Sequence, residues 1–151
     1  MTSKKQAFLG LTVIFGSLIG FLDSAYLAVF SSGKTGVACD VSGFNCDAVL
    51  TSVYSRFLGL PLSWWGLAFY ISLFFLAMAY FFLKKEMIFR LIGVWLWSGL
   101  AVSLILLYLQ AFVLKAFCIY CLISETAVFL MAAGYLAVKF LIKDKNQDVH
   151  H

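Results

Sequence analysis

Four long apolar stretches constrain this chain more than any other feature of its sequence. They cover residues 7–30, 62–83, 91–114 and 117–142. A helix rises about 1.5 Å per residue, so a stretch of about 20 residues crosses the hydrocarbon core of a bilayer. Only helices and closed barrels satisfy their backbone hydrogen bonds in lipid, and none of these stretches alternates like a barrel strand. The sequence therefore predicts four transmembrane helices.

The composition excludes a soluble domain of this size. Hydrophobic residues make up 64% of the chain and charged residues 12%, whereas soluble domains are about half apolar and about a quarter charged. We expect an all-α integral membrane fold in which residues 1–151 form one four-helix bundle. Residues 31–61 would be its only long polar loop.

Positively charged residues are spread unevenly over the connections. With four crossings, both chain ends share a side with the connection between the second and third stretches. Eight of the eleven Lys and Arg residues lie on that side, namely Lys4, Lys5, Lys84, Lys85, Arg90, Lys139, Lys143 and Lys145. Because such residues stay in the cytoplasm, we expect cytoplasmic termini. The outer loop would face the periplasm or cell exterior at a bacterial inner membrane, or an organelle lumen. The net charge of +4 then reflects topology and predicts no nucleic-acid partner.

All four cysteines lie in or beside the outer segments. Cys39 and Cys46 belong to the outer loop, and Cys118 and Cys121 open the fourth stretch. Cys118 and Cys121 share one face of a first helical turn, where backbone N–H groups and the helix dipole stabilise a thiolate. A mobile pair and a fixed pair at the edge of the lipid predict a relay of thiol–disulfide exchange.

Other interpretations of the cysteines stay open at this point. Two structural disulfides would staple the outer loop of a non-enzymatic four-span scaffold. A zinc site needs four thiolates, but the spacing lacks two close pairs and the compartment is oxidising. Inert buried thiols would have no reason to gather on one face.

The outer loop also carries a helical pattern. Apolar residues at positions 49, 50, 53, 57 and 58 give one face. Asp47 suits the first turn of such a helix, and Gly59 and Pro61 suit its end. We expect a short amphipathic helix across the top of the bundle, which either rests at the interface or covers a site and delivers Cys46 to it.

Three polar residues interrupt the apolar stretches. Asp23, Gln110 and Glu125 all fall in the outer part of the bundle, and Glu125 follows Cys121 by one turn on the same face. Ionisable groups inside a membrane are costly and usually functional. We expect a polar pocket that binds a small carrier and supplies protons; hydrogen bonding between helices is the alternative. Tyr26 would line this pocket or belong to an interfacial aromatic belt.

Several motifs together resemble the vitamin K epoxide reductase family. They are Cys39, the run Cys46-Asp-Ala-Val-Leu-Thr-Ser-Val-Tyr-Ser, the run Gly59-Leu-Pro-Leu-Ser, Gly66 and Cys118-Ile-Tyr-Cys121. The resemblance covers nearly the whole chain, and the bacterial branch is the closer match. It implies a bundle around a quinone, which would be menaquinone, ubiquinone or a form of vitamin K. Since no thioredoxin-like domain follows the fourth stretch, we expect a separate thioredoxin-like protein as thiol donor.

The resemblance also implies a role for each cysteine. Cys39 resembles the residue that exchanges with the thioredoxin-like partner, and Cys46 the shuttle that also pairs with Cys118. Cys121 resembles the residue that reacts with quinone, and Ser52 the loop serine near the shuttle. The chain would then be a quinone-dependent thiol–disulfide oxidoreductase that reoxidises its partner during disulfide formation.

A vitamin K quinone or epoxide reductase is the alternative within the same chemistry. Vertebrate enzymes of the family have an aromatic residue where this chain has Glu125. That difference and the bacterial type of loop favour reoxidation of a thiol partner.

Overall fold

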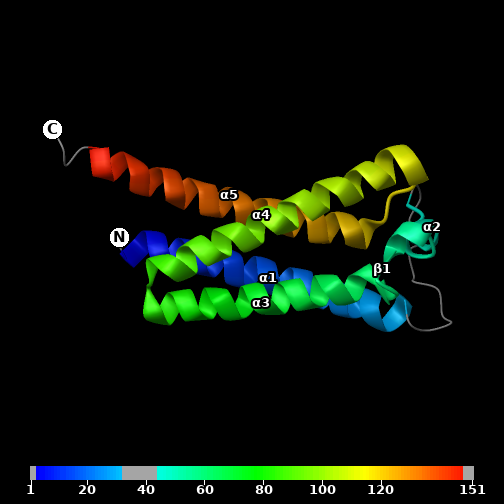
Figure 1. Cartoon of the computed structure of the whole chain (residues 1–151), viewed down its shortest axis with the longest axis horizontal. Helices are drawn as coiled ribbons and strands as arrows, with labels where there is room; N and C mark the ends of the chain where they lie inside the picture. Colours follow the sequence, from blue (N-terminus) through cyan, green and yellow to red (C-terminus); the bar gives the residue numbers. More distant parts are fainter. Residues whose placement is uncertain (1–2, 32–43, 148–151) are drawn as a thin grey trace.

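The computed structural model describes residues 3–31 and 44–147 of the chain. Four long helices dominate it (Figure 1): α1 (Ser3–Ser31), α3 (Leu62–Leu83), α4 (Glu86–Tyr108) and α5 (Ile119–Gln147). The π-helical turn η2 (Leu109–Leu114) continues α4. The short elements are α2 (Cys46–Leu50), the 3-10 turn η1 (Val53–Ser55), and the strands β1 (Arg56–Phe57) and β2 (Leu60–Pro61).

The predicted membrane bundle is confirmed. In the described residues, the helices long and apolar enough to span a bilayer are Ala7–Phe30, Leu62–Leu83, Glu86–Leu114 and Ile119–Phe140. The third therefore begins at Glu86, earlier than predicted, and the fourth begins at Ile119, later than predicted. The predicted ends were the ends of the apolar runs. In the structure, α4 also includes a polar first turn, and Phe117 and Cys118 lie outside the helix.

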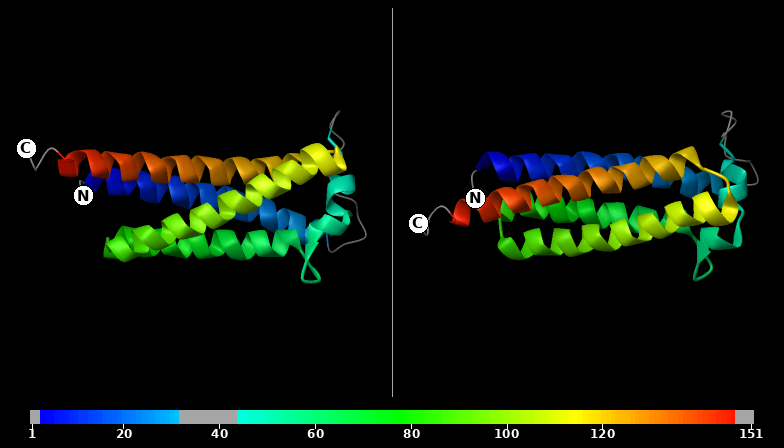
Figure 2. Two further views of the ribbon diagram at one scale, coloured as in Figure 1. Left: turned by 45° about the horizontal axis from the view of Figure 1, so that its top comes forward. Right: turned by 90° about the horizontal axis from the view of Figure 1, so that it is seen from above.

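The helices run lengthwise beside one another, and α1 packs mainly against α3 and α5. The first turn of α1, the last turns of α5 and the turn between α3 and α4 lie at one end of the bundle, and α2 lies at the other (Figure 1). That turn consists of Lys84 and Lys85. Lys84 adopts a left-handed backbone conformation, and its N–H donates to the Tyr80 carbonyl over 2.9 Å. Figure 2 shows α4 diverging from α3 beyond this turn and ending beside the start of α5.

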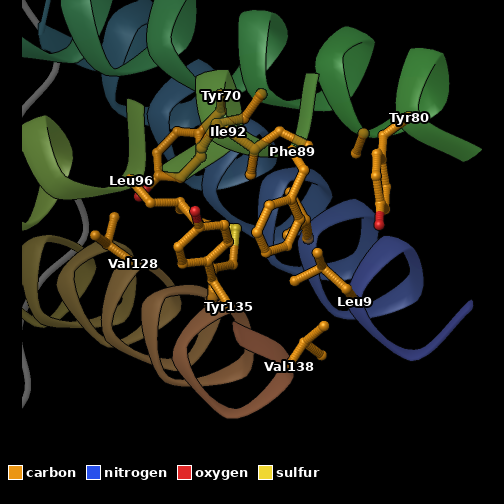
Figure 3. Close-up of a cluster of buried hydrophobic side chains, with 13 residues drawn as sticks. Leu9, Tyr70, Tyr80, Phe89, Ile92, Leu96, Val128, Tyr135 and Val138 are labelled. Atoms are coloured by element: carbon orange, nitrogen blue, oxygen red, sulfur yellow. The ribbon is translucent and has the colours of Figure 1, made fainter. Parts of the chain in front are cut away.

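A dense apolar core fills the half of the bundle near the Lys84–Lys85 turn (Figure 3). Phe89 on α4 stacks on Tyr135 of α5 with ring centroids 4.7 Å apart. Gly93 lies so close to the Tyr135 ring that a side chain there would overlap it. The fully buried members of the core include Leu9, Val13, Leu73, Ala77, Met131 and Val138. The core packs this half of the bundle tightly.

The predicted lid helix is wrong in extent. Only Cys46–Leu50 is α-helical, and Ser52 then turns to an extended backbone. The Thr51 hydroxyl donates to the Asp47 carbonyl over 2.5 Å and the Ser52 hydroxyl donates to the Val49 carbonyl over 2.7 Å. Such bonds from Ser and Thr compete with helix continuation.

Beyond Ser52 the predicted helix is replaced by the 3-10 turn η1 and then by the small hairpin β1–β2. Phe57 pairs with Leu60 across a turn in which Leu58 and Gly59 both have positive φ. Leu58 is 78% exposed, so it does not belong to a buried helical face. Glycine tolerates positive φ without strain, and the predicted stop of the helix at Gly59 is a hairpin turn in the structure.

Candidate functional site

The reduced cysteine pair stands at the start of α5. Cys118 occupies the N-cap position, with its carbonyl accepting the Leu122 N–H over 3.0 Å, and Cys121 lies in the first turn. Both are free thiols in this structure. The expectation that both belong to the helix is corrected for Cys118, because helical backbone begins one residue later.

Cys118 is the residue of the pair best placed to be a thiolate. Its sulfur accepts a hydrogen bond from the Cys121 thiol, and this bond lowers the pKa of Cys118 below its ordinary value. Burial acts against this effect, whereas the backbone N–H groups of Cys121 and Tyr120 also lower the pKa. The sulfur thus caps the helix as an N-cap oxygen would.

Cys46 lies against this pair. It is disulfide-bonded, so a zinc site with four thiolate ligands does not fit this structure. Cys46 and Cys118 are almost fully buried in one small apolar cluster with Val49. The Asn45 N–H donates to the Phe117 carbonyl over 3.0 Å and joins the start of α2 to the segment before Cys118. The predicted shuttle cysteine and its target are therefore brought together. Cys39 lies outside the described residues.

A cavity of about 510 Å³ opens beneath α2 in the half of the bundle away from the core. Cys121 and Glu125 line it from α5, Asp23 from α1, and Gln110 from η2. Ser52 lines it from the outer segment. The structure thus gathers five predicted site residues around one space.

Tyr26 is not among the residues that line this cavity. Its ring lies 4.4 Å from that of Phe30 and 4.9 Å from that of Tyr120, centroid to centroid. This aromatic cluster fits the interfacial alternative that the sequence left open for Tyr26.

A chain of buried hydrogen bonds connects the cavity with the cysteine pair. The Gln110 amide nitrogen donates to Glu125 Oε1 over 2.9 Å, and the Gln110 amide oxygen accepts the Cys118 N–H over 3.0 Å. The backbone carbonyl of Gln110 accepts the N–H of Ala116 over 3.2 Å, which closes the widened turn of η2. π-helical turns often occur at functional sites because they redirect a side chain. Here the turn directs Gln110 inward, between α5 and the loop.

Several cavity residues escaped the sequence analysis. Tyr70 on α3 is buried and hydrogen-bonds to the carbonyl and hydroxyl oxygens of Ser124 over 2.9 and 2.7 Å. Trp95 on α4 donates its indole N–H to the Ser72 hydroxyl over 2.7 Å. α3 is apolar on all sides, so no periodicity marked its inner face. The small residue Gly20, which leaves room for the Tyr70 ring, was one local signal.

The cavity suits a quinone, a flat apolar ring with oxygen atoms on opposite edges. Aromatic and apolar residues such as Trp65, Phe69 and Val102 form most of the wall. Two buried carboxyl oxygens, Asp23 Oδ2 and Glu125 Oε2, have no hydrogen-bond partner in the described structure. Binding sites for small molecules are typically apolar pockets in which a few polar groups orient the ligand. A quinone oxygen would provide an unpaired carboxyl with the partner that it lacks.

Comparison with known families agrees with this geometry. Residues 11–136 match the family described as the vitamin K epoxide reductase family. The match includes the outer segment, the cysteine pair at α5 and the cavity residues of all four long helices. Membership supports an oxidoreductase with a quinone-linked function in general. The chain folds as a membrane helix bundle with a reduced cysteine pair beside an apolar cavity, and the family match covers most of its length. It therefore belongs to the vitamin K epoxide reductase family.

Proposed function

We propose that this protein oxidises a thioredoxin-like protein and passes the electrons to a membrane quinone. The observation that carries the proposal is the joint burial of Cys46 and Cys118 in one cluster, with Cys121 opening onto the cavity. A disulfide-bonded cysteine thus adjoins a thiol that is poised as a thiolate. These are the two components that thiol–disulfide exchange requires.

The exchange begins at the outer loop. A thiolate of the reduced partner attacks Cys39 of a Cys39–Cys46 disulfide and releases Cys46 as a thiolate. Cys46 then attacks Cys118 of a Cys118–Cys121 disulfide, forming a Cys46–Cys118 bridge and releasing Cys121. The second partner thiol frees Cys39, which attacks Cys46 and releases Cys118. The thiol state described here, with Cys46 in a disulfide and both Cys118 and Cys121 reduced, corresponds to the end of this sequence.

The cavity residues bind and orient the electron acceptor. When bound, the quinone supplies a two-electron, two-proton acceptor. Cys121 is the cysteine that lines the cavity, whereas the Cys118 side chain is fully buried behind it. Val49, Leu50 and Ser52 line the cavity from the outer segment. Oxidation of the pair would restore the Cys118–Cys121 disulfide for another cycle.

We further propose that the α2 end faces the periplasm or cell exterior and that both termini are cytoplasmic. The excess of Lys and Arg at the opposite end supports this orientation. Labelling with a membrane-impermeant thiol reagent tests it in intact cells. The variant Leu58→Cys at the exposed hairpin turn should react, and Lys84→Cys should not. The reverse pattern would contradict the orientation.

The function is tested with purified protein, a reduced thioredoxin-like protein and a quinone whose absorbance is followed. Cys121→Ala should abolish quinone reduction. Cys46→Ala leaves Cys39 as a free thiol, which should attack the disulfide of the oxidised thioredoxin-like protein and give a mixed disulfide through Cys39. Thr126→Ala, an exposed truncation on α5, is the matched control and should leave turnover unchanged. Full turnover in Cys121→Ala would refute the mechanism. Reduction of vitamin K epoxide without any mixed disulfide would favour the epoxide reductase, and neither activity would favour the scaffold.

A further inference from the structure

Two buried carboxyl groups share the cavity, and neither has a cation to balance it there. Glu125 is 5% exposed and Asp23 is 9% exposed, and each keeps one buried oxygen without a hydrogen-bond partner in the described residues. The described lining of the cavity contains no Lys or Arg. An uncompensated carboxylate in apolar surroundings is costly, so both groups favour the neutral, protonated form. The cavity therefore stores protons next to the cysteine pair.

Glu125 is the carboxyl that is fixed in position. Gln110 holds Oε1 with a hydrogen bond of 2.9 Å and leaves Oε2 as the uncommitted oxygen. The same amide accepts the Cys118 N–H, so one side chain ties the carboxyl to the start of α5. Cys121 precedes Glu125 by one helical turn and lines the same cavity.

The other titratable groups near Glu125 come from neighbouring helices. Asp23 on α1 lines the same cavity and also has an oxygen without a described partner, but the Gln110 amide donates to Glu125 and not to Asp23. Tyr70 on α3 hydrogen-bonds to Ser124, so its hydroxyl proton is already engaged. Glu125 is thus the group that combines a proton, a fixed orientation and a link to the cysteines.

We propose that Glu125 donates one of the two protons consumed when a quinone is reduced at this site, that Cys121 donates the other, and that Gln110 positions Glu125. The assignment rests on the quinone reduction proposed above. Before the step, Cys118 is a thiolate and both Cys121 and Glu125 carry protons. Afterwards the two sulfurs form a disulfide and Glu125 is a carboxylate. Two electrons leave the sulfurs and two protons leave Cys121 and Glu125, which together convert quinone to quinol.

The balance of charge explains why these groups act together. The site carries one negative charge before the step, on Cys118, and one after it, on Glu125. Two negative charges, one on Glu125 at the cavity and one on the buried Cys118, would repel strongly in surroundings of low dielectric constant, so Glu125 keeps its proton while Cys118 is a thiolate. Formation of the disulfide removes the first charge and permits the second. Electron loss and proton loss are thereby coupled.

Infrared difference spectroscopy tests the assignment without relying on turnover. The fully reduced protein is mixed with a short-chain quinone, and the C=O stretching band of protonated carboxyls is followed with and without deuterated solvent. In the wild type, this band should decrease as quinol forms. Glu125→Gln should lack the change, whereas Asp23→Asn should retain it. Gln110→Leu should shift the frequency of the band, because Glu125 loses a hydrogen bond; a purely structural role for Gln110 would leave the frequency unchanged.

Rates provide the second measurement. A positioned general acid contributes about 100-fold or more, so single-turnover quinol formation should fall about 100-fold in Glu125→Gln. Glu86→Gln, which removes an exposed carboxyl at the other end of the bundle, is the control and should not change the rate. Formation of the Cys46–Cys118 bridge should be equally fast in Glu125→Gln and the wild type.

The outcomes separate this assignment from the proposed function. A band loss that persists in Glu125→Gln, or that disappears in Asp23→Asn instead, would overturn the role of Glu125. An unchanged rate of quinol formation in Glu125→Gln would do the same while leaving quinone reduction intact. Failure of the wild type to form quinol would instead reject the proposed function.

Discussion

Replacement of Gln110 by Leu should destabilise the protein through two unpaired groups and not through lost volume. Gln110 is 2% exposed, and Gln110→Leu removes its bonds to Glu125 and to the Cys118 N–H while keeping a side chain of similar size. A buried polar group left without a partner costs about 1–3 kcal/mol. Two such groups would therefore cost about 2–6 kcal/mol in total.

The membrane environment lowers this expected loss of stability. Hydrogen bonds between transmembrane helices contribute about 0.6 kcal/mol on average in measured cases. Because Glu125 borders a cavity, it can find another partner there, whereas the backbone N–H of Cys118 is enclosed. We therefore expect a loss near the lower end, about 2 kcal/mol.

A double-mutant cycle identifies the cause. Glu125→Leu combined with Gln110→Leu leaves only the Cys118 N–H unpaired, so the double variant should be less destabilised than the sum of the single changes. Unfolding in mixed detergent micelles, followed by far-ultraviolet circular dichroism, measures these free energies. Ser98→Ala removes an exposed hydroxyl from α4 and serves as the control. Strict additivity of the two single changes would refute the idea that Gln110 and Glu125 stabilise each other.

Three further predictions concern separate parts of the site. Gly20→Ala should lower the Tm of the protein and reduce quinone affinity, because the new methyl group overlaps the buried Tyr70 ring; wild-type values of both would contradict this. Cys121→Ala should raise the pKa of Cys118, because its largest stabilising hydrogen bond is lost. As pH falls, the thiolate absorbance of Cys118 should then disappear at higher pH than in wild type; an unchanged titration would exclude the thiol hydrogen bond as the cause. Asn45→Ala removes the side-chain cap of α2, and such a cap stabilises a helix by about 1 kcal/mol. Hydrogen exchange of the backbone amides in Cys46–Leu50 should therefore accelerate, and unchanged exchange would show that packing alone stabilises α2.

The effect of Cys121→Ala on the pH dependence of stability has a definite sign. A thiol whose pKa is lowered by folding stabilises the protein fully above the unfolded value, for which 9.0 is the reference. That contribution declines as pH falls and is lost below the lowered pKa. Cys121→Ala should therefore narrow the difference in stability between alkaline and neutral pH.

The sequence by itself determined the membrane bundle and predicted candidates for the reacting groups. Hydrophobic length is a local property, so four spans and their order follow directly from residue type. The cysteine pair at the start of α5 was equally visible, because spacing on one helix fixes its geometry. The position of Asp23 and Glu125 inside apolar stretches marked them as candidates for a pocket, and the structure places both of them at the cavity.

Only the tertiary structure decided how these groups meet. The end of α2 at Leu50 depends on side-chain hydroxyls of Thr51 and Ser52 that compete with the helix, and periodicity does not register that competition. The link from Glu125 through Gln110 to Cys118 needs the π-helical turn of η2, which no local pattern specified. The cavity exists because α4 diverges from α3 beyond their packed half, so its volume and lining result from the packing of whole helices and not from any one segment.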